Sequence, residues 1–266
     1  MFIDTHAHMW WSSFDEDRDQ VLAHAEASGV TKIIVPGTDL KTSKLAVELA
    51  KKYKGKIFAA VGIHPEESII NKQTDLQDQL TRIKELIDEN REYIVAVGEV
   101  GTDAYTDELK SVLPLQQDFF RRQIEIAQEY GLPVIVHTRN SLTETLEVID
   151  QMQVEPKGQF HCFSNDEEGL REVLKRGFSV SFAGNITWSK RVRRLVELVP
   201  NDKLLLETDS PLMMPRDSRG EPLMDNLRNE PINVTILARL QAELRGQPLK
   251  ALEIQTSANA IELFRV

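Results

Sequence analysis

The sequence contains a single cysteine, Cys162, among 266 residues, which excludes an internal disulfide. It also has no run of about 20 apolar residues, the length needed to cross a bilayer, and no signal peptide at its start. We therefore expect a cytoplasmic protein with no membrane association. No feature of the sequence indicates an obligate protein partner.

Positive charge is also scarce, since the formal net charge is −10. Proteins that coat nucleic acid do so with a broad face of clustered Lys and Arg, which this composition disfavours. If the protein acts on phosphodiesters, the attraction must be local and come from bound cations and a few arginines.

A glycine-rich phosphate-binding fingerprint, an internal repeat and a Pro-, Gly- or Ser-rich linker are all missing. Their absence disfavours an open doubly wound sheet and a chain divided into parts. A length of 266 residues suits one α/β barrel, which takes about 250. We expect a single domain over residues 1–266.

What the sequence does contain is eight short, nearly continuous apolar runs, each followed by an amphipathic segment. Such runs are typical of parallel strands that are buried on both faces. They predict an α/β fold, a (β/α)₈ TIM barrel. The predicted strands are Met1 to Thr5, Lys32 to Pro36, Ile57 to Gly62, Ile94 to Gly98, Pro133 to Val136, Lys157 to Phe160, Phe178 to Phe182 and Lys203 to Glu207.

Some element ends are also predictable. A helix is expected over Lys41 to Tyr53, with Thr42 or Ser43 as its N-cap. After the last strand we expect a loop from Ser210 to Asn229, and then a helix opened by Pro231.

Residues that bind metals cluster where the predicted strands end. Five of the six histidines lie at or just beyond a C-terminal strand end, whereas His24 falls inside a helix and is expected at the surface. The residues at strand ends are His6, His8, His64, Glu99, His137, His161 and Asp209. A barrel brings these ends together at one mouth, where such enzymes keep their active sites. His6 and His8, two apart, face the same way on an extended strand.

Each of these residues has a simpler interpretation. A histidine at a strand end is more often a structural hydrogen-bonding group, and Asp209 alone could cap a turn. Coincidence of all of them at one mouth is improbable. Imidazole and carboxylate together suit Zn²⁺, Mn²⁺ or Fe²⁺ better than an oxygen-only cage. Six ligands are natural for two ions that share a carboxylate, an arrangement that performs hydrolysis.

The order of several motifs resembles the TatD-type metal-dependent deoxyribonucleases, within the amidohydrolase-like superfamily. The resemblance extends from Asp4 to Phe264. The main motifs are Asp-Thr-His-Ala-His at 4–8, Gly-Ile-His-Pro at 62–65, Gly-Glu-Val-Gly at 98–101, Pro-Val-Ile-Val-His-Thr-Arg at 133–139, His-Cys-Phe-Ser at 161–164 and Glu-Thr-Asp-Ser-Pro at 207–211.

This resemblance implies a two-metal site (Zn, Mn or Mg) that hydrolyses phosphodiesters at nucleic-acid ends, often from the 3′ end. By position it implies His6, His8, Glu99 and Asp209 as ligands of one ion, and Glu99, His137 and His161 as ligands of the other. Asp209 would also orient or deprotonate the attacking water. His64 and Arg139 would contact phosphate.

The sequence departs from the family pattern at Thr102, Asn165, residues 212–214 and the pair Trp10 and Trp11. We expect these positions to line or flank the mouth and to affect substrate choice. Trp10 and Trp11 would stack on unpaired bases or pack the first loop against the barrel. Cys162, next to His161, is expected in the core.

Two groups of Lys and Arg residues either contact phosphates or lie on a solvated surface. They are Lys190, Arg191, Arg193 and Arg194 after the seventh strand, and Arg216, Arg219 and Arg228 after the eighth.

The leading hypothesis is a two-metal 3′–5′ exonuclease acting on single-stranded DNA, or on RNA. The alternative is a small-molecule amidohydrolase, lactonase or phosphotriesterase on the same barrel. Many such enzymes bridge their ions with a carboxylated lysine, but no lysine occurs over residues 93–98. A third hypothesis, a non-catalytic metal-binding barrel, conflicts with the intact set of ligands.

Overall fold

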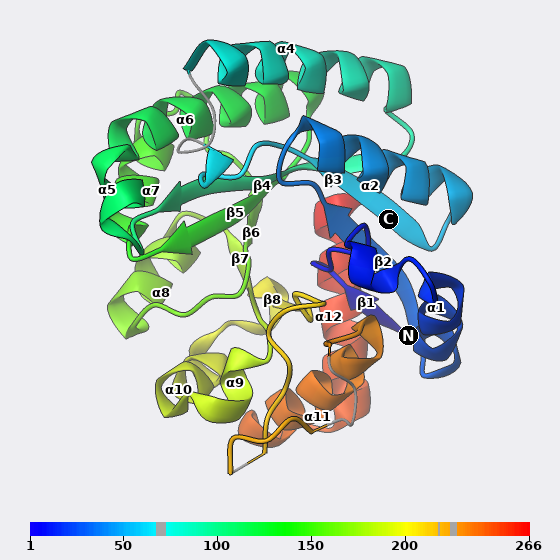
Figure 1. The fold of residues 1–266 in the computed structure, drawn as a ribbon. Coiled ribbons are helices and arrows are strands. Elements are labelled where there is room, and N and C mark those ends of the chain that lie inside the picture. Colours follow the sequence, from blue (N-terminus) through cyan, green and yellow to red (C-terminus); the bar gives the residue numbers. More distant parts are fainter. Residues whose placement is uncertain (68–72, 218, 224–227) are drawn as a thin grey trace.

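The computed structural model describes residues 1–67, 73–217, 219–223 and 228–266, excluding the side chains of residues 73–75. Eight parallel strands follow one another around a single sheet in sequence order (Figure 1). They are β1 (Phe2–Asp4), β2 (Val30–Pro36), β3 (Ile57–Val61), β4 (Ile94–Asp103), β5 (Val134–Arg139), β6 (Gly158–Phe160), β7 (Ser179–Phe182) and β8 (Leu204–Leu206). All eight predicted strands are confirmed, as is the (β/α)₈ barrel.

Backbone hydrogen bonds close the sheet between β8 and β1. The amide of Thr5 donates to the carbonyl of Leu206 at 2.9 Å, and the amide of Asp209 donates to the carbonyl of His6 at the same distance. An isolated parallel bridge between Ala7 and Ser210 continues this pairing beyond the strands. The segments that follow β1 and β8 are therefore held side by side at the mouth.

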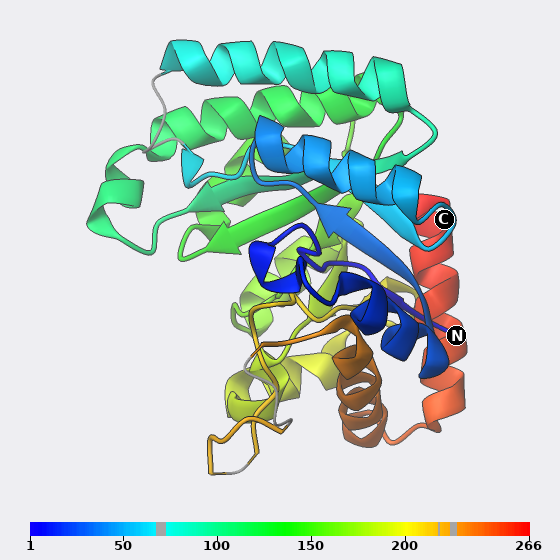
Figure 2. The ribbon, with the colours of Figure 1, turned by 45° about the vertical axis from the view of Figure 1, so that its right-hand side comes forward.

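Helices surround the sheet (Figures 1 and 2). They are α1 (Arg18–Ala27), α2 (Leu40–Lys52), α4 (Gln73–Asn90), α5 (Asp107–Ser111), α6 (Leu113–Tyr130), α7 (Leu142–Asp150), α8 (Glu167–Lys175), α9 (Asn185–Trp188), α10 (Lys190–Leu198), α11 (Val234–Leu244) and α12 (Leu249–Phe264), with 3₁₀ turns η1 (Ser12–Phe14), η2 (Asn201–Lys203) and η3 (Pro231–Asn233). None of the described helices is both long and apolar enough to cross a membrane.

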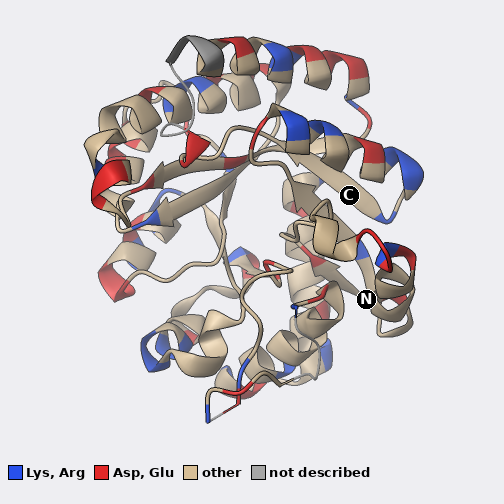
Figure 3. Cartoon of the chain, viewed as in Figure 1, with Lys and Arg blue, Asp and Glu red and all other residues tan. Residues whose placement is uncertain are grey.

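Buried apolar residues of the sheet form two clusters. Ile3, Ile34, Ile135 and Leu205 form one buried cluster, and Phe264 of α12 packs against it. A larger cluster fills the space between the strands and the surrounding helices. Charged residues of both signs lie mainly on the outer helices (Figure 3). The rigid barrel thus presents its polar interior groups at one end.

Two local expectations differ from the structure. The N-cap of α2 is Asp39 rather than Thr42 or Ser43. The Asp39 carboxylate accepts from the Thr42 amide at 2.7 Å, and the Thr42 hydroxyl accepts from the Asp39 amide, which is a capping box. Pro231 opens η3 ahead of α11, as expected. Within the expected loop from Ser210 to Asn229, residues 218 and 224–227 lie outside the described residues.

Candidate metal centre and active site

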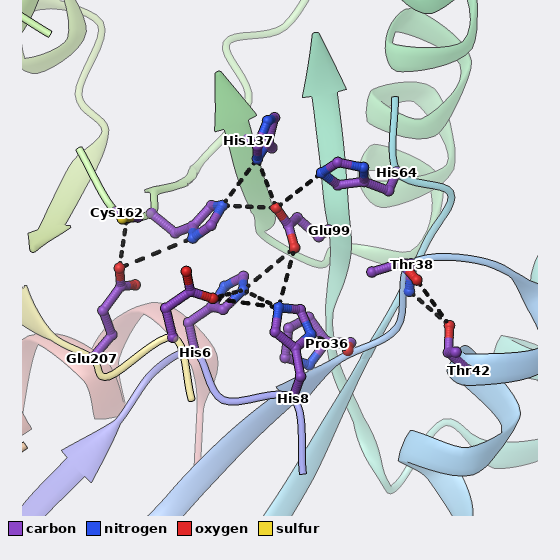
Figure 4. Close-up of polar contacts among 12 residues, drawn as sticks. His6, His8, Pro36, Thr38, Thr42, His64, Glu99, His137, Cys162 and Glu207 are labelled. Atoms are coloured by element: carbon purple, nitrogen blue, oxygen red, sulfur yellow. Dashed lines mark hydrogen bonds and ion pairs between the residues drawn. The ribbon is translucent and has the colours of Figure 1, made fainter. Parts of the chain in front are cut away.

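The six predicted ligands converge at the mouth from five different segments (Figure 4). His6 and His8 follow β1, Glu99 belongs to β4 and His137 to β5, while His161 follows β6 and Asp209 follows β8. His64, from the segment after β3, joins the same cluster.

The first group of donor atoms surrounds one carboxylate oxygen of Glu99. His6 Nε2 and His8 Nε2 lie 3.2 Å apart and are 3.4 and 3.6 Å from Glu99 Oε2. Asp209 Oδ1 is 3.7 and 3.4 Å from the same two nitrogens. Ligands at about 2.0–2.2 Å around a tetrahedral ion lie roughly 3.3–3.6 Å from one another. These separations therefore fit a divalent cation at the centre.

The second group surrounds the other oxygen of Glu99. Oε1 lies 2.9 Å from His137 Nδ1 and 2.8 Å from His161 Nε2, and these two nitrogens are 3.4 Å apart. His64 Nε2 is 3.3 Å from the same oxygen. Glu99 thus faces one group of donors with each oxygen. The structure brings His64, the expected phosphate contact, as close to Glu99 as several of the expected ligands.

The electrostatics of the cluster favour a bound cation. Glu99 is only 3% exposed, and no described Lys or Arg pairs with it or with Asp209. Burial opposes ionisation of Glu99, but the surrounding histidines hold its pKa well below the usual value. Burial, with the charge of His161, lowers the pKa of His6 to about 4, so its ring is neutral at neutral pH. The ionised Glu99 carboxylate and the neutral His6 ring are in the form that binds a divalent ion, whereas His8, His137 and His161, whose pKa values are raised, must lose a proton to bind one.

Irregular backbone pairing sets the direction of some of these side chains. The pairing of β4 with β5 shifts register between Val97 and Val100, and such irregularities redirect side chains near active sites. His6 and His8 do not lie on a strand, contrary to our reasoning, because β1 ends at Asp4. They share a face because Ala7 bridges Ser210 and keeps the segment extended.

His8 is oriented by the backbone of β2. Its Nδ1 lies 3.4 Å from the carbonyl of Pro36, which leaves Nε2 directed at the cluster. Trp10 Nε1 donates to the same carbonyl at 2.6 Å, and its ring lies edge-on to that of His8. Trp10 therefore packs the first loop and supports a ligand. Trp11, 36% exposed, remains available for stacking.

Asp103 is a functional candidate that sequence reasoning missed. Its Oδ2 lies 2.9 Å from His137 Nε2, opposite the nitrogen that faces Glu99, and Asp103 is 1% exposed. Burial lowers the pKa of His137, but the hydrogen bonds with Asp103 and Glu99 outweigh it and raise that pKa to about 10. The available signal was an acidic residue four positions after Glu99.

We expect Asp103→Ala to weaken metal binding at the group that contains His137 by about 10- to 100-fold, the usual effect of removing a ligand's hydrogen-bond partner. The measurement is a titration of metal-free protein against a chelating dye. Asp107→Ala, which changes an exposed aspartate on α5, is the matched control. Equal affinities in the two variants would contradict a positioning role.

A polar layer lies beneath the cluster. Glu207 accepts from the Ser181 hydroxyl at 2.6 Å, the Gln159 amide at 3.0 Å and the backbone amide of Cys162 at 2.5 Å. Burial raises the pKa of Glu207 to about 7. The bond to the Cys162 amide helps to hold the segment that carries His161.

The expectation that Cys162 is a core residue is wrong. Because β6 ends at Phe160, alternation along a strand does not apply, and Cys162 adopts a φ of 43° at the cavity wall. Thr102 was expected near the mouth but is fully buried, with its hydroxyl 2.8 Å from that of Ser141 and 2.6 Å from that of Thr145.

A cavity of about 610 Å³ lies over the cluster. Trp10, Trp11, Leu212 and Met213 line it, and so does Arg139, whose guanidinium carbon is 3.3 Å from the ring centre of Tyr105. The cavity has the size of an ordinary ligand pocket, about 300–1,000 Å³. It therefore suits a small group or the end of a strand, rather than a duplex.

Comparison with known proteins agrees with this architecture. The chain is 36% identical to the uncharacterized metal-dependent hydrolase YabD of Bacillus subtilis over the full length of both, and 34% identical to the 3′-5′ ssDNA/RNA exonuclease TatD of Cronobacter sakazakii over 95% of this chain and 94% of that one. The crystal structure of YjjV, a TatD homologue from Escherichia coli, superposes with a TM-score of 0.89 at 28% identity, covering 100% of this chain and 98% of that one.

A family model described as TatD related DNase matches residues 3–265. That range includes both groups of donor atoms and the residues that orient them. The chain belongs to the TatD-related DNase family and is a metal-dependent hydrolase.

Proposed function

We propose that this protein is a two-metal exonuclease that removes nucleotides from the 3′ end of single-stranded DNA or RNA. The observation that carries the proposal is the position of Glu99, whose two oxygens face two separate groups of histidine and aspartate donors. The names of relatives at about a third identity support the substrate and polarity.

Six side chains would hold the ions: His6, His8, Glu99, His137, His161 and Asp209. Divalent ions held by these side chains would lower the pKa of a bound water and offset charge on the reacting phosphate. Zn²⁺ and Mn²⁺ suit this mixed donor set, and Mg²⁺ would act where phosphate oxygens complete the ligands.

The residues around the ions would bind and orient the substrate. Burial raises the pKa of Asp209, but the hydrogen bond with His8 and the charge of His8 bring it below its ordinary value, and the ionised carboxylate would accept the proton of the attacking water. Arg139 would contact a phosphate from the cavity rim, and His64 would contact one beside Glu99. Trp11 would stack on a base.

The proposal is tested with 5′-labelled single-stranded DNA and metal-stripped protein, to which Mg²⁺, Mn²⁺ or Zn²⁺ is returned. We expect a metal-dependent ladder that shortens from the 3′ end. Circular single-stranded DNA should resist cleavage because it has no end. Asp209→Asn protein controls for contaminating nucleases.

Two outcomes would contradict the proposal. Cleavage of the circle would replace an exonuclease by an endonuclease. Absence of cleavage with every ion, in protein shown to hold two metals per chain, would indicate a small ester, lactone or amide as substrate instead.

A further inference from the structure

An exposed tryptophan lies on the cavity wall away from the first loop. Trp188, the last residue of α9, is 43% exposed and lines the same cavity as Glu99 and Asp209. The guanidinium carbon of Arg216 lies 5.9 Å from the centre of its ring, within the range of a cation–π contact. An exposed aromatic face beside cations is the usual platform for an unpaired base.

Several cations close to Trp188 in the sequence have no carboxylate partner. Some cations elsewhere on the surface pair with carboxylates, as in Lys56 with Glu26 and Lys84 with Glu129, and others do not. Five cations on α10 and in the last loop form no ion pair within the described parts of the chain: Lys190, Arg191, Arg193, Arg194 and Arg216. In Figure 3 part of the α10 ribbon is blue, the colour of Lys and Arg. We call Trp188 and these five cations the α9–α10 patch.

The other cations of the last loop do not belong to this patch. Arg219 pairs with Asp217 at 3.0 Å, and Arg228 pairs with Asp17 at 2.5 Å. These two arginines therefore stabilise the loop itself. Their carboxylate partners distinguish Arg219 and Arg228 from the cations of the α9–α10 patch.

The backbone beneath Trp188 is firmly held. Arg193 Nε donates to the carbonyl of Ile186 at 2.7 Å, and Arg191 Nη2 donates to the carbonyl of Ser164 at the same distance. The amide of Arg216 donates to the Thr187 hydroxyl at 2.9 Å. These hydrogen bonds hold the backbone next to Trp188 in place. Less conformational entropy is therefore lost when a base stacks on its ring.

We propose that the α9–α10 patch binds the single-stranded part of the substrate on the 5′ side of the scissile bond, with a base stacked on Trp188 and phosphates along α10. This inference rests on the proposed function. A cavity of about 610 Å³ accepts only the strand end, so the rest of the strand must leave over the rim. The rim after β3 carries the exposed Glu66, which repels phosphates, whereas the rim at α10 carries Arg191.

Binding of a fluorescent 12-mer and of a dinucleotide tests the stacking role. All proteins carry Asp209→Asn so that the oligonucleotides stay intact. We expect Trp188→Ala to raise the dissociation constant of the 12-mer by about 10-fold, and to raise that of the dinucleotide much less. Trp188→Phe, which keeps an aromatic face, should restore most of the loss.

The salt dependence of 12-mer binding tests the charges. Lys190→Gln combined with Arg194→Gln should lower the slope of log K against log salt by about 0.7 for each phosphate that is no longer neutralised. The matched control is Lys54→Gln combined with Lys84→Gln, which removes two cations outside the cavity lining and should leave the slope unchanged.

The outcomes separate this inference from the function on which it rests. If wild-type protein cleaves the 12-mer but Trp188→Ala weakens both oligonucleotides equally or neither, the patch is not a binding surface for the strand. An unchanged salt slope in the Lys190 and Arg194 variant would likewise exclude phosphate binding along α10. If wild-type protein does not cleave the 12-mer at all, the exonuclease proposal itself has failed.

Discussion

Glu99→Ala protein is expected to lose both metal ions and to lose activity by at least about 1,000-fold, equivalent to roughly 4 kcal/mol of transition-state stabilisation. The reason is geometric. Oε2 of Glu99 faces His6 and His8 at 3.4 and 3.6 Å, while Oε1 faces His137 and His161 at 2.9 and 2.8 Å. Glu99 is the residue that offers one oxygen to each group, although His6 also lies within ligating distance of His161.

The measurement is metal content per chain after gel filtration, alongside the nuclease assay. Glu99→Gln retains the shape of the side chain and checks that loss of metal does not come from unfolding, because removing one partner of a buried ion pair can cost about 3–5 kcal/mol. His24→Ala, at an exposed histidine of α1, is a control that should keep both ions. Two ions retained by folded Glu99→Ala protein would refute the bridging role.

Single-ligand variants sharpen this experiment. His8→Ala removes a donor of the first group only, and His137→Ala removes a donor of the second group only. Each should therefore weaken one ion more than the other, whereas Glu99→Ala affects both. Identical metal content in the three variants would mean that the two groups are not independent sites.

Asp209→Asn is expected to lower kcat by about 100- to 10,000-fold, the range for loss of a general base, while the fold and most of the metal content persist. Asparagine fills the same space and keeps an oxygen donor, and His6, His8 and Glu99 remain in place around it. What it lacks is the negative charge and the ability to accept a proton.

The assay compares kcat of Asp209→Asn and wild-type protein at saturating oligonucleotide, with metal content and circular dichroism measured on the same samples. A large loss of kcat with both ions present supports the role in proton transfer. Near wild-type activity in the variant would exclude it. Loss of metal in parallel with activity would instead make Asp209 chiefly a ligand.

Sequence periodicity was sufficient to predict the barrel. Eight apolar runs of strand length predicted eight strands, because parallel strands buried on both faces need continuous apolar segments. Strand ends were less predictable. β4 continues to Asp103 because it pairs with β5 as far as that residue. β1 stops at Asp4, and only an isolated bridge at Ala7 continues its pairing.

The sequence did not predict which cationic and aromatic side chains have partners and which are exposed. Trp10 and Trp11 are neighbours of the same residue type. Trp10 donates to the carbonyl of Pro36, whereas Trp11 is exposed. Arg216 and Arg228 are equally basic, but only Arg228 has acidic partners among the described residues. Trp188 gave no sequence signal, because its proximity to Glu99 depends on the closure of the barrel.

The sequence by itself therefore determined the fold and which histidines and carboxylates gather at the mouth, since a strand and its final residue are local features and the barrel brings all strand ends to one place. The tertiary structure decided which donor atoms share an oxygen of Glu99, that Asp103 orients His137, and which surface groups already have partners. Each of these depends on distances between side chains from different strands, which are fixed only when the barrel closes.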